Sequence, residues 1–130
     1  MDFELPFGVK GLQELVVTTE LTASAFNSGL VEVFATPAMV ALMEKTCQLS
    51  IQPLLPDGFI TVGTLVNIRH LKATPVGMMV RCESELAEQD RKKLTFKVKV
   101  WDETGMIGDG LHERFIVNAD DFMNKLTKTK

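Results

Sequence analysis

Apolar and polar residues follow two different periods along the chain, and the change of period separates a helical segment from a series of strands. Residues 38–43 are six consecutive apolar residues, and a largely apolar pattern continues to Gln52. A segment that is apolar on nearly all sides predicts a helix buried inside the fold. Pro37 suits a first helical position and Pro53 ends the segment, so we expect a helix from Pro37 to about Gln52.

The other segments alternate or are rich in β-branched residues, which is typical of strands. Residues 12–22 predict one strand before the helix, and residues 61–71, 78–89, 94–101 and 106–117 predict four strands after it, joined by short polar connections. Alternation predicts that one side of the second strand carries Val62, Thr64, Val66, Ile68 and His70. It predicts that one side of the fourth carries Leu94, Phe96, Val98 and Val100.

The order of these elements indicates the fold class. One strand, one long helix and a run of four strands favour an α+β fold with an antiparallel sheet rather than alternating β and α units. A sheet of about five strands with one apolar face can wrap around the buried helix. The chain of 130 residues is long enough for one core, so we expect a single domain over residues 1–130, with residues 120–130 as a frayed polar tail.

Charge and composition exclude several classes of function. The formal net charge of −3 provides no basic surface for nucleic acid. No apolar run is long enough for a membrane span, and the acidic N-terminus resembles no signal peptide. Cys47 and Cys82 lie in apolar surroundings without metal-ligand spacing, so we expect no metal site, two reduced thiols and a cytoplasmic location.

Three residues could carry chemistry. Glu44 lies near the edge of the apolar arc of the predicted helix, and burying an unpaired carboxylate is costly, so it needs a partner, a cavity or a proton. His70 ends the apolar side of the second strand, and Thr36 is expected to cap the helix, where free N–H groups favour negative charge. Together they could form an acyl-transfer site.

Each of these residues also has an ordinary structural interpretation. Thr36 is by default a helix cap, Glu44 a partly exposed or ion-paired helix residue, and His70 a structural residue on a strand. Only their convergence in the fold would make them a site.

Three segments of the chain resemble one known family. The runs FATPAMVALMEKTC, TVGTLVNIRHLKATPVG and GDGLHERFIV, in that order, resemble the fluoroacetyl-CoA thioesterase-like family of hotdog-fold proteins. The resemblance implies that the sheet and helix form a hotdog fold. It implies catalytic roles for Thr36, Glu44 and His70, and substrate-side roles for Gly63 and Arg114.

The reaction that the resemblance implies is hydrolysis of an acyl-CoA thioester to a free acid and CoA, with CoA entering as part of the substrate and no cofactor. Glu44 would attack the carbonyl or activate water, and His70 would protonate the departing thiolate. Family members specific for fluoroacetyl-CoA carry a lid phenylalanine where Leu30 stands here. We therefore expect a general small acyl-CoA rather than a fluorinated one.

Two alternatives to a thioesterase use the same fold. A non-catalytic module would bind CoA esters or another small molecule without turnover. A hydratase or dehydratase would resemble hotdog enzymes that place a histidine near the central helix, and this helix has none.

The predicted sheet also has an exposed edge strand, which proteins usually cover. We therefore expect a homodimer, with a tetramer as a further option. Glu44 and His70 could then act across subunits.

Overall fold

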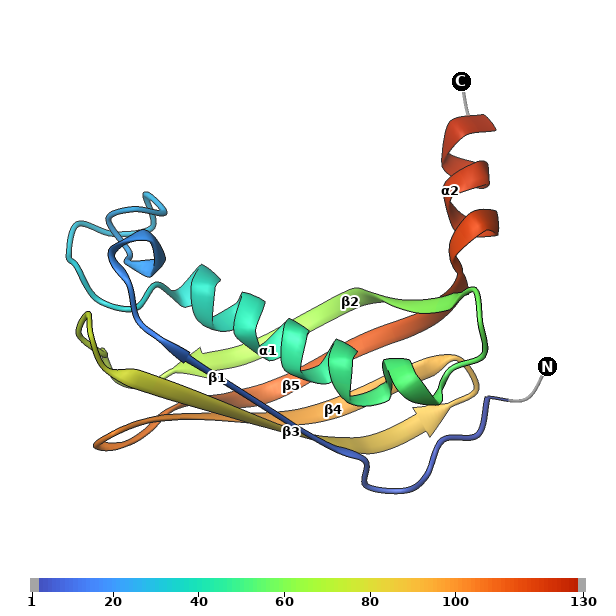
Figure 1. The fold of residues 1–130 in the computed structure, drawn as a ribbon, viewed down its shortest axis with the longest axis horizontal. Helices are drawn as coiled ribbons and strands as arrows, with labels where there is room; N and C mark the ends of the chain where they lie inside the picture. Colours follow the sequence, from blue (N-terminus) through green and yellow to red (C-terminus); the bar gives the residue numbers. More distant parts are fainter. Residues whose placement is uncertain (1–2, 129–130) are drawn as a thin grey trace.

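Five antiparallel strands form one sheet that curls around a single long helix, as Figure 1 shows. The computed structural model describes residues 3–128. The expected order of one strand, one long helix and four strands is confirmed. The elements are β1 (Lys10–Val16), η1 (Thr19–Leu21), α1 (Thr36–Ile51), η2 (Gln52–Leu54), β2 (Phe59–His70), β3 (Met79–Asp90), β4 (Lys93–Asp102), β5 (Gly105–Asn118) and α2 (Ala119–Lys128).

The strand order β1-β3-β4-β5-β2 makes β1 and β2 the two edges of the sheet. On the outer face, opposite charges stand across from one another: Glu83 pairs with Lys99 and Glu85 with Lys97. Such cross-strand pairs stabilise the register and keep this face in water. The inner face packs against α1.

The core lies between α1 and the inner face of the sheet. The alternation predicted for the fourth strand is confirmed, because Leu94, Phe96, Val98 and Val100 are all buried. From α1, residues such as Met39, Met43 and Cys47 fill the concave side. The helix lies mainly over β1 and β3. Part of the inner face of β2 therefore remains open, and Val66 is 44% exposed there.

The prediction that five alternate residues of β2 share one side is wrong for two of them. The pairing of β2 with β5 shifts between Gly63 and Leu65, which inserts one extra residue into β2. A β-bulge of this kind reverses the alternation beyond it. Thr61 and Gly63, rather than Val62 and Thr64, therefore share the inner side with Val66, Ile68 and His70, opposite the inward residues of β5.

The first strand is shorter than predicted. Its pairing with β3 ends where Val16 meets Met79, and backbone hydrogen bonds between Val17 and both Met78 and Gly77 extend it by one residue, so the residues after Val17 have no strand to pair with. They turn instead into the short helix η1 and a loop. β-branched residues alone therefore overestimated the strand, because a strand needs a neighbouring ladder.

The prediction of a frayed tail over residues 120–130 is wrong for its described part, which forms α2. Asn118 accepts a hydrogen bond from the backbone N–H of Asp121 at 3.0 Å and so caps the helix. Acidic residues occupy its first turn, and Lys125 and Lys128 its last, which complements the helix dipole. Residues 129–130 lie outside the described part of the chain.

Among residues 3–128, no helix is long and apolar enough to cross a membrane.

Candidate active site

The first group of the site forms where α1 begins. The helix starts at Thr36, and its N-cap residue, Ala35, provides no side-chain cap. The expectation that the Thr36 hydroxyl caps the helix is therefore wrong. Its Oγ1 instead lies 2.8 Å from Nδ1 of His70, at the end of β2. The structure thus brings together two of the three residues proposed for chemistry.

His70 has one ring nitrogen free for chemistry. Its Nε2 is buried and makes no direct hydrogen bond to the described residues. Burial lowers the pKa of His70, and the backbone of Lys72 offsets part of that effect. The ring therefore stays neutral at physiological pH. A cavity of about 290 Å³ opens beside it, lined by Ala23, Val33, Phe34, Thr36, His70 and Leu71, among others.

The second group forms around Glu44, two turns further along α1. Glu44 projects toward β2, and its side chain is 42% exposed. Its Oε2 lies 4.0 Å from Nη1 of Arg114. It would lie 2.9 Å from a Cβ atom built on Gly63. Gly63 and Arg114 are therefore neighbours of Glu44.

Arg114 is held in place on every side of its guanidinium. It is 7% exposed. Its Nε donates to the Thr61 hydroxyl at 2.7 Å and its Nη2 to the Thr61 carbonyl at 3.0 Å. Burial lowers the pKa of Arg114 and Glu44 opposes this, but an arginine remains charged at neutral pH. The site therefore presents a fixed positive charge to Glu44.

His112 also belongs to this group, and the alternation of β5 puts it on the same side as Arg114. Its Nδ1 lies 2.8 Å from the carbonyl oxygen of Leu65. A carbonyl can only accept, so Nδ1 carries the proton, and Nε2 accepts from Nη1 of Arg114 at 3.0 Å. His112 is 1% exposed. It therefore ties Arg114 to the bulge in β2. Its position two residues before Arg114 on one strand was the available signal.

Both histidines make stability depend on pH. Burial lowers the pKa of His70 and of His112, so the unfolded chain binds more protons near pH 6. We expect the free energy of unfolding to be nearly constant between pH 7 and pH 8 and to fall as pH drops through 6.5 toward 5. Each histidine contributes a slope of at most about 1.4 kcal/mol per pH unit.

Urea denaturation between pH 5 and pH 8 measures this slope. His112→Gln removes one titrating group and should flatten the curve. A free energy of unfolding that is constant or rises from pH 7 to pH 5 would contradict the expectation.

Gly63 gives Glu44 its room. Its φ angle is not in the left-handed region, so alanine there adds a methyl group that lies 2.9 Å from Glu44 Oε2, 3.3 Å from the His112 ring and 3.4 Å from Arg114 Nη1. We expect Gly63→Ala to displace the carboxylate by a few tenths of an ångström and lower kcat by about 10- to 100-fold. The thermal midpoint should fall only slightly, because the half-exposed carboxylate moves easily and the His112 ring needs to give by only a few tenths of an ångström. An unchanged kcat would show that the position of Glu44 is not critical.

One chain does not assemble all three residues into one constellation. Thr36 and Glu44 are eight residues apart on α1, which is about 12 Å along the axis. Thr36 and His70 form one half, and Glu44, Gly63, His112 and Arg114 form the other. Over residues 3–128, no group of three or more histidine, cysteine or acidic residues could hold a metal ion.

Comparison with known proteins gives consistent results. The sequence model of the family described as fluoroacetyl-CoA-specific thioesterase matches residues 17–120. A fluoroacetyl-CoA thioesterase of Streptantibioticus cattleyicolor is 37% identical over 95 residues, which cover 73% of this chain and 68% of that protein.

Solved structures agree in fold. The structure of a fluoroacetyl-CoA thioesterase superposes with a TM-score of 0.91, at 29% identity over 98% of both chains. A single-residue variant of such an enzyme, in complex with fluoroacetate and CoA, superposes with a TM-score of 0.86, at 31% identity over 91% of this chain and 99% of that one. The expected hotdog fold is therefore confirmed.

Proposed function

The chain belongs to the fluoroacetyl-CoA-specific thioesterase family and hydrolyses acyl-CoA thioesters, and from this premise we propose that a homodimer does so at a site built from Thr36, Glu44 and His70. The observation that carries the proposal is the spacing of the two half-sites. In one chain, His70 lies beside Thr36 and Gly63 beside Glu44. A two-fold axis midway between the two pairs would bring the Thr36–His70 pair of one chain beside Glu44 and Gly63 of a second chain.

The unpaired edge of β2 provides the axis. Antiparallel pairing of β2 with the β2 of a second copy uses a two-fold axis perpendicular to the sheet and leaves both helices on the same face. If Gly63 of one copy pairs with His70 of the other, the axis passes near Val66 and Asn67. On α1, the midpoint between Thr36 and Glu44 is Val40, so an axis that also passes near Val40 relates the two half-sites of the helix in the same way.

The same operation therefore joins the halves. The Thr36–His70 pair of one protomer meets Glu44 and Gly63 of its partner, and two equivalent sites form per dimer. The partly exposed stripe of α1 that includes Ala41 and Glu44 is covered at the same time. Pairing of the two β2 strands also covers this edge of each sheet, which otherwise offers unpaired N–H and C=O groups. Analytical ultracentrifugation should find twice the chain mass of 14.4 kDa, and any tetramer appears as a further species.

Each residue has a defined task in this composite site. The Glu44 carboxylate either attacks the thioester carbonyl, forming a transient anhydride, or removes a proton from the attacking water. The free N–H groups in the first turn of α1, or the backbone at Gly63, stabilise the negative oxygen. His70 delivers the proton that the CoA thiolate needs to leave as a thiol. Thr36 orients the ring through Nδ1.

Arg114 helps to orient Glu44, because its guanidinium Nη1 lies 4.0 Å from the carboxylate oxygen Oε2 and attracts it. His112 and Thr61 hold Arg114, so they act as positioning residues. The CoA group is released as product, and the reaction needs no resident cofactor.

The acyl group is expected to be small and not restricted to fluoroacetyl. Leu30 stands at the lid position and is 98% exposed in the single chain. An aliphatic side chain offers no aromatic face against the substrate. The free, buried thiols of Cys47 and Cys82 fit a reducing compartment, and we place the enzyme in the cytoplasm.

Thiol release from a panel of acyl-CoA esters tests the proposal. The panel should include acetyl-, fluoroacetyl-, propionyl-, butyryl- and hexanoyl-CoA at matched concentrations. We expect turnover of several short esters with less than tenfold preference for fluoroacetyl-CoA. Saturable binding of CoA esters without turnover would instead support a binding module, and strong preference for the fluorinated ester would contradict the role given to Leu30.

A further inference from the structure

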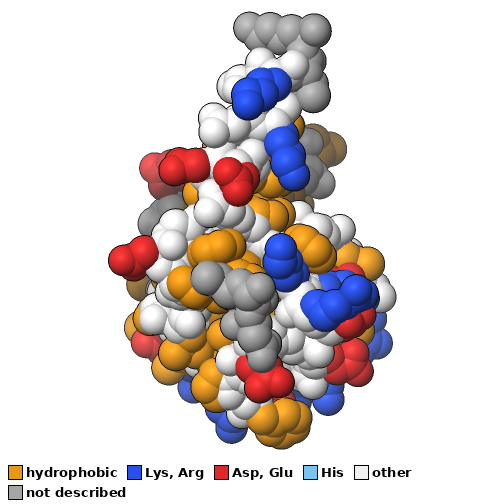
Figure 2. Space-filling view, turned by 90° about the vertical axis from the view of Figure 1, so that its right-hand side faces the viewer, with side chains coloured by type: hydrophobic (Ala, Val, Ile, Leu, Met, Phe, Trp, Pro, Cys, Tyr) orange, Lys and Arg blue, Asp and Glu red, His pale blue; other side chains and the backbone are white. Residues whose placement is uncertain are grey.

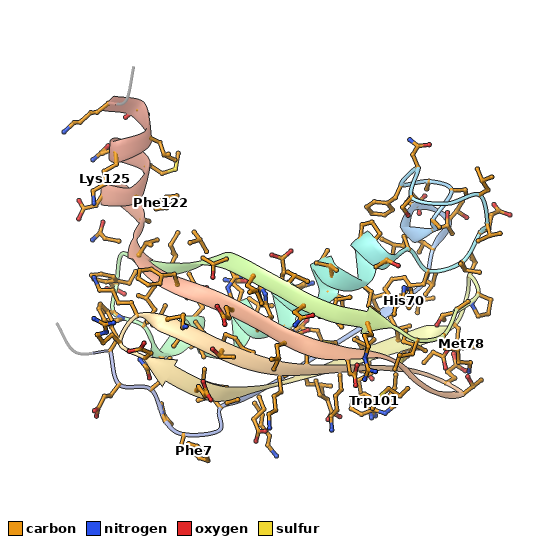
Figure 3. The ribbon with its side chains drawn as sticks, turned by 180° about the vertical axis from the view of Figure 1, so that it is seen from behind. Phe7, His70, Met78, Trp101, Phe122 and Lys125 are labelled. Atoms are coloured by element: carbon orange, nitrogen blue, oxygen red, sulfur yellow. The ribbon has the colours of Figure 1, made fainter. Side chains whose placement is uncertain are left out.

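Two segments of the chain expose apolar side chains at opposite ends of the molecule. The first is α2, where Phe122, Met123 and Leu126 share one face and Met123 is 56% exposed. The second is the lid loop, residues 26–33, where Phe26 is 43%, Leu30 98% and Val31 58% exposed. Figure 3 places Phe122 on α2 at one end and His70 beside the loop at the other.

Both segments rise from the same face of the sheet. In Figure 1, the lid loop and α2 both project on the side that carries α1, and Figure 2 shows α2 standing clear of the body. The base of α2 is anchored to the start of β2, because Ala119 N–H donates to the Gly58 carbonyl at 2.9 Å. The base of the loop is anchored beyond the end of β2, where Val33 forms a bridge with Pro75.

The proposed two-fold axis brings these two bases together. If Gly63 pairs with His70 of the partner, the start of β2 and Gly58 before it run toward the partner's chain beyond His70, where Pro75 lies. The axis is perpendicular to the sheet, so projections from one face remain on one face. α2 of one protomer then rises beside the lid loop of the other.

We infer that α2 packs its apolar face on the partner's lid loop and holds that loop over the partner's Thr36–His70 pair. The inference rests on the proposed homodimer and adds a second contact to it. The charges agree with this packing: Lys125 and Lys128 lie toward the tip of α2, whereas Glu20 and Glu32 belong to the segment around the loop. The partner that covers the exposed lid loop is therefore a second copy of this chain.

This arrangement gives the pocket a wall supplied in trans. Leu30, which is almost fully exposed in one chain, becomes covered by the partner's helix. The lid loop then closes over the acyl group, and its contact with the partner's α2 restricts how far it can move. Residues on α2 would thus influence substrate choice without touching the reacting atoms.

Disulfide trapping between two single variants tests the inference. Purified Leu30→Cys and Met123→Cys are mixed, allowed to exchange subunits, and oxidised mildly. The native thiols should not interfere, because both are buried and burial raises the pKa of Cys47 to about 12 and of Cys82 to about 11. Within one chain the two new thiols lie at opposite ends of β2, a strand of 12 residues and so roughly 40 Å long.

We expect a covalent dimer, on a non-reducing gel, in up to about half of the mixed sample, because about half of the dimers are mixed after exchange. Each variant alone should give almost none. The matched control pairs Leu30→Cys with Phe7→Cys, since Phe7 is 96% exposed but belongs to neither segment. A band of equal strength in this control would overturn the inference, as would no band in the test pair.

Sedimentation of the same samples separates the two possible failures. A dimer that does not cross-link contradicts the contact between α2 and the loop but leaves the proposed site standing. A monomer contradicts both.

Discussion

Glu44→Gln lowers kcat for acyl-CoA hydrolysis by about 10³-fold or more, with KM changed much less. Glutamine keeps the size of the side chain but can neither attack the thioester nor accept a proton from water. It can still lie against Arg114 and Gly63, which are its neighbours in the structure. The binding of substrate should therefore survive while the chemical step fails. Thiol release under saturating substrate measures the effect.

The matched control is Gln48→Ala, one turn further along the same side of α1 and also partly buried. It should keep activity within a few-fold of the unchanged protein. If Glu44→Gln retained a tenth of the original kcat, Glu44 could not be the nucleophile or the base.

Labelled water tests the nucleophilic role of Glu44. After many turnovers in ¹⁸O water, hydrolysis of an anhydride at the Glu44 carboxyl carbon leaves the label in the protein. Attack of water on the thioester, or on the acyl carbon of the anhydride, places it only in the released acid. Label in the peptide that contains Glu44, detected by mass spectrometry, therefore establishes the nucleophilic role.

Mixing two inactive variants restores activity if the site is composite. In a mixed dimer of Glu44→Gln and His70→Ala, one site carries both substitutions and the other carries neither. Random exchange makes half of the dimers mixed, so we expect about a quarter of the original activity from a mixture of two inactive proteins. This is the largest gain that any single experiment on this chain should give.

The controls for this mixture are simple. Each variant alone, at the same total concentration, should remain inactive. A mixture of Glu44→Gln with Glu44→Ala should also stay inactive, because no dimer then contains an intact Glu44. If the first mixture stays inactive although subunits have exchanged, the three residues do not combine across the interface, and the proposed two-fold arrangement is wrong.

Local sequence pattern was enough to predict the order and type of the main elements. Hydrophobic period is a local property, so a nearly all-apolar helix and four alternating strands could be read without knowledge of their neighbours. The buried alternation from Leu94 to Val100 shows this clearly. The helix α2 was missed although Asn118, the two acids and the two lysines carry the signals of its ends. Its apolar residues share one face, but none of them is buried, so this face does not pack on the core that periodicity detects.

The sequence also indicated which side chains could carry chemistry. A carboxylate at the edge of an apolar helix has a high energetic cost unless the fold gives it a partner, and Glu44 was selected on that ground. The resemblance then pointed to Gly63 and Arg114, and the structure places both beside Glu44.

How these residues meet depends on contacts between elements that are distant along the chain. The bulge after Gly63 depends on pairing between β2 and β5, so no local pattern could show that Thr61 rather than Val62 faces inward. The Thr36 hydroxyl forms a hydrogen bond with His70, 34 residues away, and does not cap the helix that begins at Thr36. His112 became part of the site only through the Leu65 carbonyl and the Arg114 guanidinium. Periodicity depends on residues that are close together in the sequence. A site depends on contacts between strands and helices that only the folded chain brings together.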